Sequence, residues 1–460
     1  MPGTPKNPGH HEPNRALPYL GLALLTCLAY GRAVRFGFFH DDLFLARPLD
    51  TWRFLGLSPV GFYWRPLWTL WMSAQYQLFG LHPGAMHAAS LALHVLNCWL
   101  ALSFLLAAGV RRSVAVATVA LWTILAGNSY PIVWISACND LLAMAFLIPA
   151  SQLILTPAER PPSAARTAVS SLLWLLSVLA KDIALVWPVA AAAILWARAG
   201  RAGTRGTSRG ATLGRMAMPL VALLLYALLR ARAQAAGGGY ALTDLPGRGG
   251  HLHGYSAAVV VLGRAVHFLE ALVYSYLPLD LFRSWVALGL GTLIAIGFAS
   301  ILVAAYRTRR HPLGTPVAFG LGWLVLFSLH GLVIPHPRAL YVPTLGLAFL
   351  VCTLALGTDL FRRRWAPALA CAAYLGMHIH LGQQSADFHS PDSPATLIHT
   401  SQLVLGSDPR ITPEMKAYLR SQLRYENVDS LARLTKEENA LWRTQLQRTL
   451  RKVGGETAGR

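Results

Sequence analysis

Long apolar runs, separated by short polar or basic stretches, dominate the chain from about residue 16 to residue 382. The runs last about twenty residues, which is the length that crosses a bilayer as a helix. Strands of an outer-membrane barrel would instead alternate apolar and polar residues over about ten positions. The pattern therefore predicts an all-α, polytopic membrane protein.

Eleven apolar runs are interpreted as membrane spans, and both flanking regions differ from them in composition. The run that comes first ends in Arg32 and Arg35 and has no small-residue cleavage site, so we expect a retained span rather than a signal peptide. Residues 1–15 are rich in Pro and Gly, and we expect them to be disordered. Residues 383–460 hold nine of the 20 acids and are expected to form a small helical tail. The predicted spans are 16–35, 86–108, 113–127, 139–155, 167–180, 183–199, 214–232, 285–306, 314–334, 339–358 and 366–382.

Basic residues give the orientation. A cytoplasmic N-terminus places the main basic clusters on the cytoplasmic side, provided that 256–278 lies in the outer interface and does not cross. The tail is then extracytoplasmic. The loops 36–85, 128–138, 233–255 and 334–338 face outward, and the polar residues collected there are expected to line a site.

Composition agrees with this class of protein. Apolar residues make up 54% of the chain and charged residues 13%, about half the usual charged fraction, which excludes a soluble enzyme and a disordered chain. The 40 Lys and Arg against 20 Asp and Glu follow the positive-inside rule, so nucleic acid is not expected as a partner. The five cysteines form no CxxC pair and indicate neither a disulfide framework nor a thiolate metal site.

An acidic doublet, Asp41-Asp42, follows the first span. Only eleven acids occur before residue 383, and these two have Phe38 and Phe39 beside them. A carboxylate at a water–lipid boundary among aromatic rings can have its pKa raised toward that of a general base. A solvated loop pair or a helix N-cap is the alternative interpretation.

Three cations are expected on the same outer side. Arg65 precedes Pro66, which can begin a helix whose N-terminus favours anions, and Lys181 and Arg338 stand where the positive-inside rule disfavours them. Guanidinium and ammonium groups near a base fit transfer from a lipid-linked phosphate donor. The alternatives are an interfacial anchor at Arg65 and a Lys181–Asp182 pair that caps a helix junction.

Polar residues inside the spans have a simpler interpretation. His87, His94 and Asn97 share one helix face, but without an HxxxH spacing or a third ligand they indicate hydrogen bonds between helices rather than zinc. Asp140 begins the fourth span. The chain has no P-loop, Rossmann fingerprint or HExxH motif, which disfavours nucleotide hydrolysis, redox and zinc-protease functions.

Six motifs follow one another along residues 36–346. They are the Asp41-Asp42 doublet, WRPL at 64–67, FGLHPGAMHAASLALHVLN at 79–97, WISACNDLLA at 134–143, LAKDIALVWP at 179–188 and PRALYVPTLG at 337–346. In this order they resemble the motifs of the C-type (GT-C) integral membrane glycosyltransferases, in particular the protein O-mannosyltransferases that carry tetratricopeptide repeats.

The resemblance implies a GT-C fold over 16–382 and transfer of one sugar, with mannose as the default, from a polyprenyl-phosphate donor to a hydroxyl of a protein, lipid or glycan. It implies that Asp41 is the base and Asp42 its support. Donor binding would fall to Arg65, Lys181, Arg338 and Tyr341, with His87, His94, Asn97, Asp140 and Asp182 in supporting roles. No cofactor is required, and a divalent metal stays open because the doublet offers too few ligands. An Ala/Arg/Gly-rich composition favours the inner membrane of a bacterium, with membrane lipids around the spans.

Several positions depart from the family pattern. Tyr130 stands where a Glu is frequent, Cys138 replaces an Arg, Asp182 replaces a Glu, Pro337 replaces an acid and Ser90 replaces an Asn. A catalytically inactive scaffold therefore stays open. A transporter or lipid flippase is the other alternative, although it predicts two similar halves and no internal repeat is evident.

Overall fold

The computed structural model describes residues 16–38, 42, 64–125, 128–155, 163–189, 191, 209–235, 314–333 and 340–357. Every regular element in these ranges is a helix and none is a strand, which confirms the all-α prediction for this part of the chain. Several expected features lie outside the described residues: the N-terminal 1–15, the spans 285–306 and 366–382, the segment 256–278, the tail 383–460, Asp41 and Arg338.

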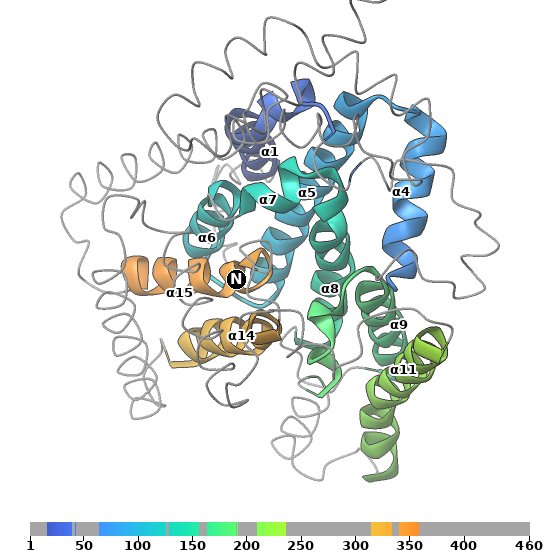
Figure 1. Ribbon diagram of the computed structural model, residues 1–460. Helices are drawn as coiled ribbons and strands as arrows, with labels where there is room; N and C mark the ends of the chain where they lie inside the picture. Colours follow the sequence, from blue (N-terminus) through green and yellow to red (C-terminus); the bar gives the residue numbers. More distant parts are fainter. Residues whose placement is uncertain are drawn as a thin grey trace, which may run out of the picture.

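The helices begin and end close to the limits that the apolar runs predict. Prolines begin α4, α5 and α15, because the first turn of a helix does not need the backbone N–H that proline lacks. The elements are α1 (Leu17–Tyr30), η1 (Gly31–Arg35), α4 (Pro66–Phe79), α5 (Pro83–Ala107), α6 (Arg112–Ile124), α7 (Ser129–Val133), η3 (Ile135–Cys138), α8 (Asn139–Leu155), α9 (Ala164–Ala180), η4 (Asp182–Ala184), α11 (Arg209–Ala235), α14 (Gly314–Val333) and α15 (Pro343–Gly357) (Figure 1).

Three helical stretches of the described chain are long and apolar enough to cross a membrane: Leu17–Arg35, Pro83–Ala107 and Ile135–Ile154. They correspond to the predicted spans 16–35, 86–108 and 139–155. Shorter apolar helices occupy Arg112–Ile124, Ala164–Ala180, Phe319–Ser328 and Pro343–Thr353.

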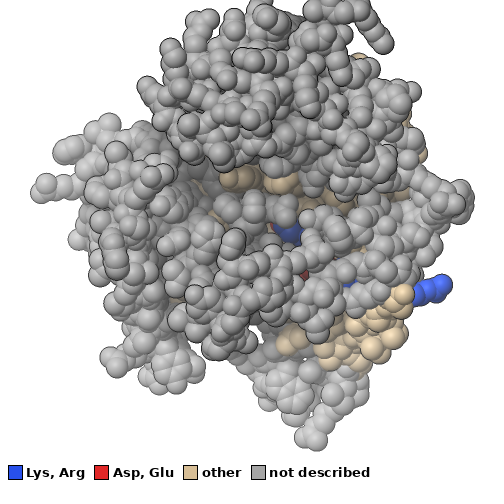
Figure 2. All heavy atoms as spheres, in the orientation of Figure 1, with Lys and Arg blue, Asp and Glu red and all other residues tan. Residues whose placement is uncertain are grey.

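The outer surface of α1 carries a leucine stripe. Its members recur every three or four residues and are 57% to 67% exposed: Leu17, Leu20, Leu24 and Leu28. The opposite face of the helix, with Leu22, Thr26 and Tyr30, is buried. A contiguous apolar surface of this kind suits lipid better than water. On the molecular face drawn in Figure 2, the visible atoms of described residues are mostly neither acidic nor basic.

The core lies where α5 and α8 pack together, with α6, α9 and α1 around them. Its largest buried side chains include Trp122, Trp174, Tyr30 and Tyr341. Helices α14 and α15 form a second close pair against α6. At their crossing, a Cβ added to Gly346 would lie 2.8 Å from the carbonyl oxygen of Gly320, so only glycine allows the two backbones to approach this closely.

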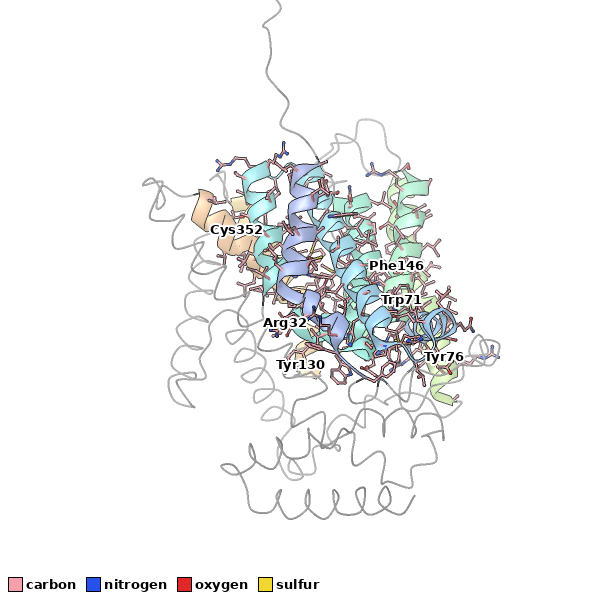
Figure 3. All side chains as sticks on the ribbon, turned by 90° about the horizontal axis from the view of Figure 1, so that it is seen from above. Arg32, Trp71, Tyr76, Tyr130, Phe146 and Cys352 are labelled. Carbon is pink, nitrogen blue, oxygen red and sulfur yellow. The ribbon has the colours of Figure 1, made fainter. Side chains whose placement is uncertain are left out.

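At one end of the bundle, η1 meets the start of α5, where a Cβ on Gly84 would lie 2.6 Å from the Val34 carbonyl oxygen. Arg32 and Tyr130 lie toward this end, while Phe146 and Cys352 lie farther along the bundle (Figure 3). Helix α4, which carries Tyr76, lies near the same end of the bundle (Figure 3). This arrangement agrees with the prediction of a loop helix between the first two spans.

Candidate functional site

Asp42 is anchored inside the protein. Its side chain is fully buried, and the backbone N–H of Ser136 donates to its Oδ1 at 2.7 Å. The interpretation of the doublet as a solvated loop pair is therefore wrong for Asp42. The bond joins the segment after α1 to η3, so the first and fourth motifs of the sequence contact each other.

Lys181 and Asp140 form a buried ion pair. The Lys181 ammonium donates to Asp140 Oδ2, and the side chains are 3% and 0% exposed. Each charge offsets the other, because either one alone in this interior would be strongly unfavourable. Asp140 Oδ1 has no hydrogen-bond partner among the described residues. The protein itself thus supplies an anionic partner for Lys181, at the start of α8.

Asp182 is held by a different helix. The Tyr226 hydroxyl donates to Asp182 Oδ1 at 2.7 Å, and the Arg230 guanidinium lies 3.9 Å from Oδ2. Tyr226 and Arg230 are one turn apart on α11, so both reach the same carboxylate. The predicted Lys181–Asp182 pair is therefore not the pairing that occurs, since each member of this dipeptide has its own partner.

Arg230 also reaches the segment that carries Arg65. It donates to the Trp64 carbonyl oxygen at 3.1 Å, and its guanidinium carbon lies 5.8 Å from the centre of the Trp64 ring. Arg65, at the N-cap of α4, is buried and acts electrostatically on Tyr226. Two of the predicted cation-bearing segments, at 65 and 181, are thus connected through α11.

Sequence reasoning passed over Tyr226 and Arg230. A signal for them existed, because Arg230 and Arg232 stand at the outer end of the predicted span 214–232, against the positive-inside rule. Lys181 and Arg338 stand against the same rule in the predicted topology.

His94, Asn97 and Tyr341 form a buried hydrogen-bonded group. His94 Nε2 lies 3.2 Å from the Thr123 carbonyl oxygen, which can only accept, so Nε2 carries the proton. His94 Nδ1 then accepts from the Tyr341 hydroxyl at 2.7 Å, and that hydroxyl accepts from Asn97 Nδ2 at 3.2 Å. The expectation of hydrogen bonds between helices is confirmed here. Tyr341 is fully buried, so it holds the start of α15 against α5 rather than presenting its hydroxyl to solvent.

His87 holds the chain just before the acidic doublet. Its Nε2 lies 3.2 Å from the Gly37 carbonyl oxygen, and its ring packs edge-on against Phe36 at 6.2 Å between centres. Because the carbonyl accepts, Nε2 is the donor in this bond. The side chain is buried and positions residues 36–38 on α5.

Cys138 lies at the meeting point of α4 and the carboxylates. Its thiol lies beside the indoles of Trp68 and Trp71 and within electrostatic range of Asp42 and Asp140. Its sulfur is also 4.0 Å from Met72 Sδ. The inward face of α4 therefore lies next to the residues predicted to carry the chemistry.

Tyr130 stands where the glycosyltransferase family that the motifs resemble frequently has Glu. Burial raises the pKa of its phenol, so the side chain stays neutral and does not replace a carboxylate. Among the described residues, no group of three or more His, Cys, Asp and Glu side chains could hold a metal ion.

The comparison with protein-family models gives no match, and the comparison with curated proteins gives none either.

Proposed function

We propose that this protein is a glycosyltransferase that moves one sugar from a polyprenyl-phosphate donor to a hydroxyl acceptor on the extracytoplasmic face. The sugar we propose is mannose, on the resemblance of the motifs. The fold would be GT-C, with eleven spans over 16–382 and a cytoplasmic N-terminus in a bacterial inner membrane.

The observation that carries the proposal is the pairwise contact of the motifs. Asp42 contacts Ser136, and Asp140 contacts Lys181. His94 contacts Tyr341, which lies 247 residues away in sequence. Five of the six motifs thus take part in these three contacts. The remaining motif, WRPL, is joined to the Lys181 segment by Arg230. Motifs that contact one another in this way can serve one common site, which supports the proposal.

In the proposed reaction, a carboxylate takes the proton of the incoming hydroxyl while its oxygen attacks the anomeric carbon of the sugar. The bond from that carbon to the phosphate oxygen breaks, and the lipid phosphate leaves with the electron pair. Asp41 would be the base. Asp42 would be its support, since one of its oxygens already accepts from the Ser136 N–H.

Cations would stabilise the charge that develops on the departing phosphate. Arg65 and Arg338 are proposed for direct contact. Lys181 would act together with Asp140, whose carboxylate it already binds. The two charges would therefore contribute jointly to the electrostatic potential at the site. Tyr341 would contribute by fixing the chain three residues after Arg338.

The test is sugar transfer in membranes that hold equal amounts of wild type, Asp41→Asn or Asp42→Asn, with radiolabelled polyprenyl-phosphate mannose. We expect Asp41→Asn to lower transfer by at least about a hundredfold, as loss of a general base does. Asp42→Asn should lose less, because its amide oxygen can still accept from Ser136. Equal transfer by wild type and Asp41→Asn would remove Asp41 from the mechanism. Failure of wild type with a panel of lipid-linked sugars would reject the enzyme function.

A further inference from the structure

The inward face of α4 carries two indoles and one amide. Trp68, Trp71 and Gln75 follow at intervals of three and four residues. At 3.6 residues per turn, these positions fall within about 60° of one another around the helix. Nothing in the proposed reaction uses this face.

This face lies against the carboxylates of the site. The indoles of Trp68 and Trp71 lie near the Cys138 thiol, which is within electrostatic range of both Asp42 and Asp140. Met72, the residue after Trp71, has its sulfur 4.0 Å from the same thiol. Trp71 lies toward the end of the bundle that also carries Arg32 and Tyr130 (Figure 3).

Buried polar atoms on both sides of this contact have no hydrogen-bond partner within the described part of the chain. On α4 the atom is the acceptor Gln75 Oε1. On α8 they are the acceptors Asn139 Oδ1 and Asp140 Oδ1. Buried polar groups are nearly always hydrogen-bonded in native proteins, so unpartnered acceptors on α4 and at the start of α8 point to a polar ligand that donates to them.

A sugar ring has the matching chemistry. Its hydroxyls both donate and accept, and its C–H face is apolar and suits an indole ring. Trp68 is only 2% exposed, whereas Trp71 is partly exposed. Trp71 is therefore the indole of this face that a ligand can reach.

We propose that Trp71 and Gln75 form the subsite for the sugar of the lipid-linked donor. The ring of a hexose stacks on Trp71, and one of its hydroxyls donates to Gln75 Oε1. This inference rests on the proposed function, since it places the donor sugar beside the Asp42 carboxylate.

The test measures binding rather than transfer, with the full-length protein in nanodiscs. Dissociation constants are determined for bare polyprenyl phosphate and for the same lipid phosphate carrying mannose or glucose. We expect wild type to prefer at least one glycosylated lipid over the bare lipid by about tenfold, the ratio that corresponds to 1.4 kcal/mol.

Four variants are compared with wild type. Trp71→Leu should abolish the preference while leaving the affinity for bare lipid phosphate unchanged, and Trp71→Phe should retain most of it because a ring remains. Gln75→Leu, which removes the acceptor at similar volume, should lower the preference and covers the case in which Trp71→Leu does not fold. Trp99→Leu is the matched control, because Trp99 is exposed on α5 and donates to the Tyr19 carbonyl oxygen.

The outcomes separate the inference from the proposed function. A preference that persists in both Trp71→Leu and Gln75→Leu would overturn the subsite, as would a wild type that binds bare and glycosylated lipid equally. In both cases, recognition of the lipid phosphate would stand. A wild type that binds none of the three lipids would overturn the proposed function and the subsite together.

Discussion

The hydroxyl of Tyr341 donates to Nδ1 of His94 across 2.7 Å, between residues 247 positions apart. The same hydroxyl accepts from Asn97, and the Trp122 indole donates to the Tyr341 carbonyl oxygen at 3.0 Å. Both ends of this residue are therefore fixed to α5 and α6, and the position of α15 depends on it.

Tyr341→Phe should destabilise the protein markedly. It leaves His94 Nδ1 and one Asn97 donor bond unsatisfied in the interior, at a cost of about 1–3 kcal/mol for each group left without a partner. The measurement is the thermal unfolding midpoint of the purified protein in detergent. Tyr19→Phe is the control, since the Tyr19 hydroxyl bonds Ser103 in a partly buried position. Equal shifts for the two variants would contradict the assignment.

Lys181→Met alone should lower the free energy of unfolding more than the double substitution Lys181→Met with Asp140→Leu. The single change leaves a carboxylate unpaired in the interior, which costs about 3–5 kcal/mol, whereas replacement of both partners by apolar residues is often nearly neutral. Denaturation of wild type, both single variants and the double variant gives the coupling energy. Strictly additive effects would mean that the two side chains do not form a buried pair.

Gly346→Ala should separate α14 from α15. The new Cβ would lie 2.8 Å from two backbone atoms, the Gly320 oxygen and the Leu324 nitrogen, and neither can move without the helix. We expect a loss of about 1–3 kcal/mol, as for other overpacked sites. Gly322→Ala, where a Cβ meets nothing within 4 Å, should be neutral or slightly stabilising. A ranking in the opposite order would contradict the close crossing.

Arg230→Gln should weaken use of the donor if the proposed function holds. It removes the charge near Asp182 and the bond to the Trp64 carbonyl oxygen, so the segments that carry Arg65 and Lys181 lose their connection. We expect KM for the lipid-linked sugar to rise about tenfold, corresponding to one charge-assisted hydrogen bond. Arg232→Gln, on the exposed side of the same helix, serves as the control and should leave KM unchanged. A similar rise in both variants would point to a general effect of charge.

Local sequence pattern predicted the helices but not the pairing at residues 181 and 182. The helix class followed from the apolar runs, because a bilayer fixes the length of a span. At Lys181 the backbone is extended, with φ −159° and ψ 141°, and successive side chains of an extended chain point to opposite sides. Lys181 and Asp182 therefore turn away from each other and toward different helices, which adjacency in the sequence does not reveal.

The structural role of Tyr341 also could not be predicted from the sequence. The motif placed it among the donor-binding residues, yet its hydroxyl lies in the core between His94 and Asn97. Only the packing of α15 against α6 and α5 brings these residues together. By contrast, the shared face of His94 and Asn97 was predictable, because a spacing of three residues is set by the helix itself.

The separation of the motif partners along the chain has a consequence for biosynthesis. His94 and Asn97 belong to an early helix, while Tyr341 is made about 250 residues later. Until that part of the chain is inserted, the two early side chains have no Tyr341 to bind, and contacts of such long range form slowly. The polar centre of the protein is therefore assembled late. A chain that stops before Tyr341 would form an incomplete helix bundle in the membrane, and such a bundle would be readily degraded.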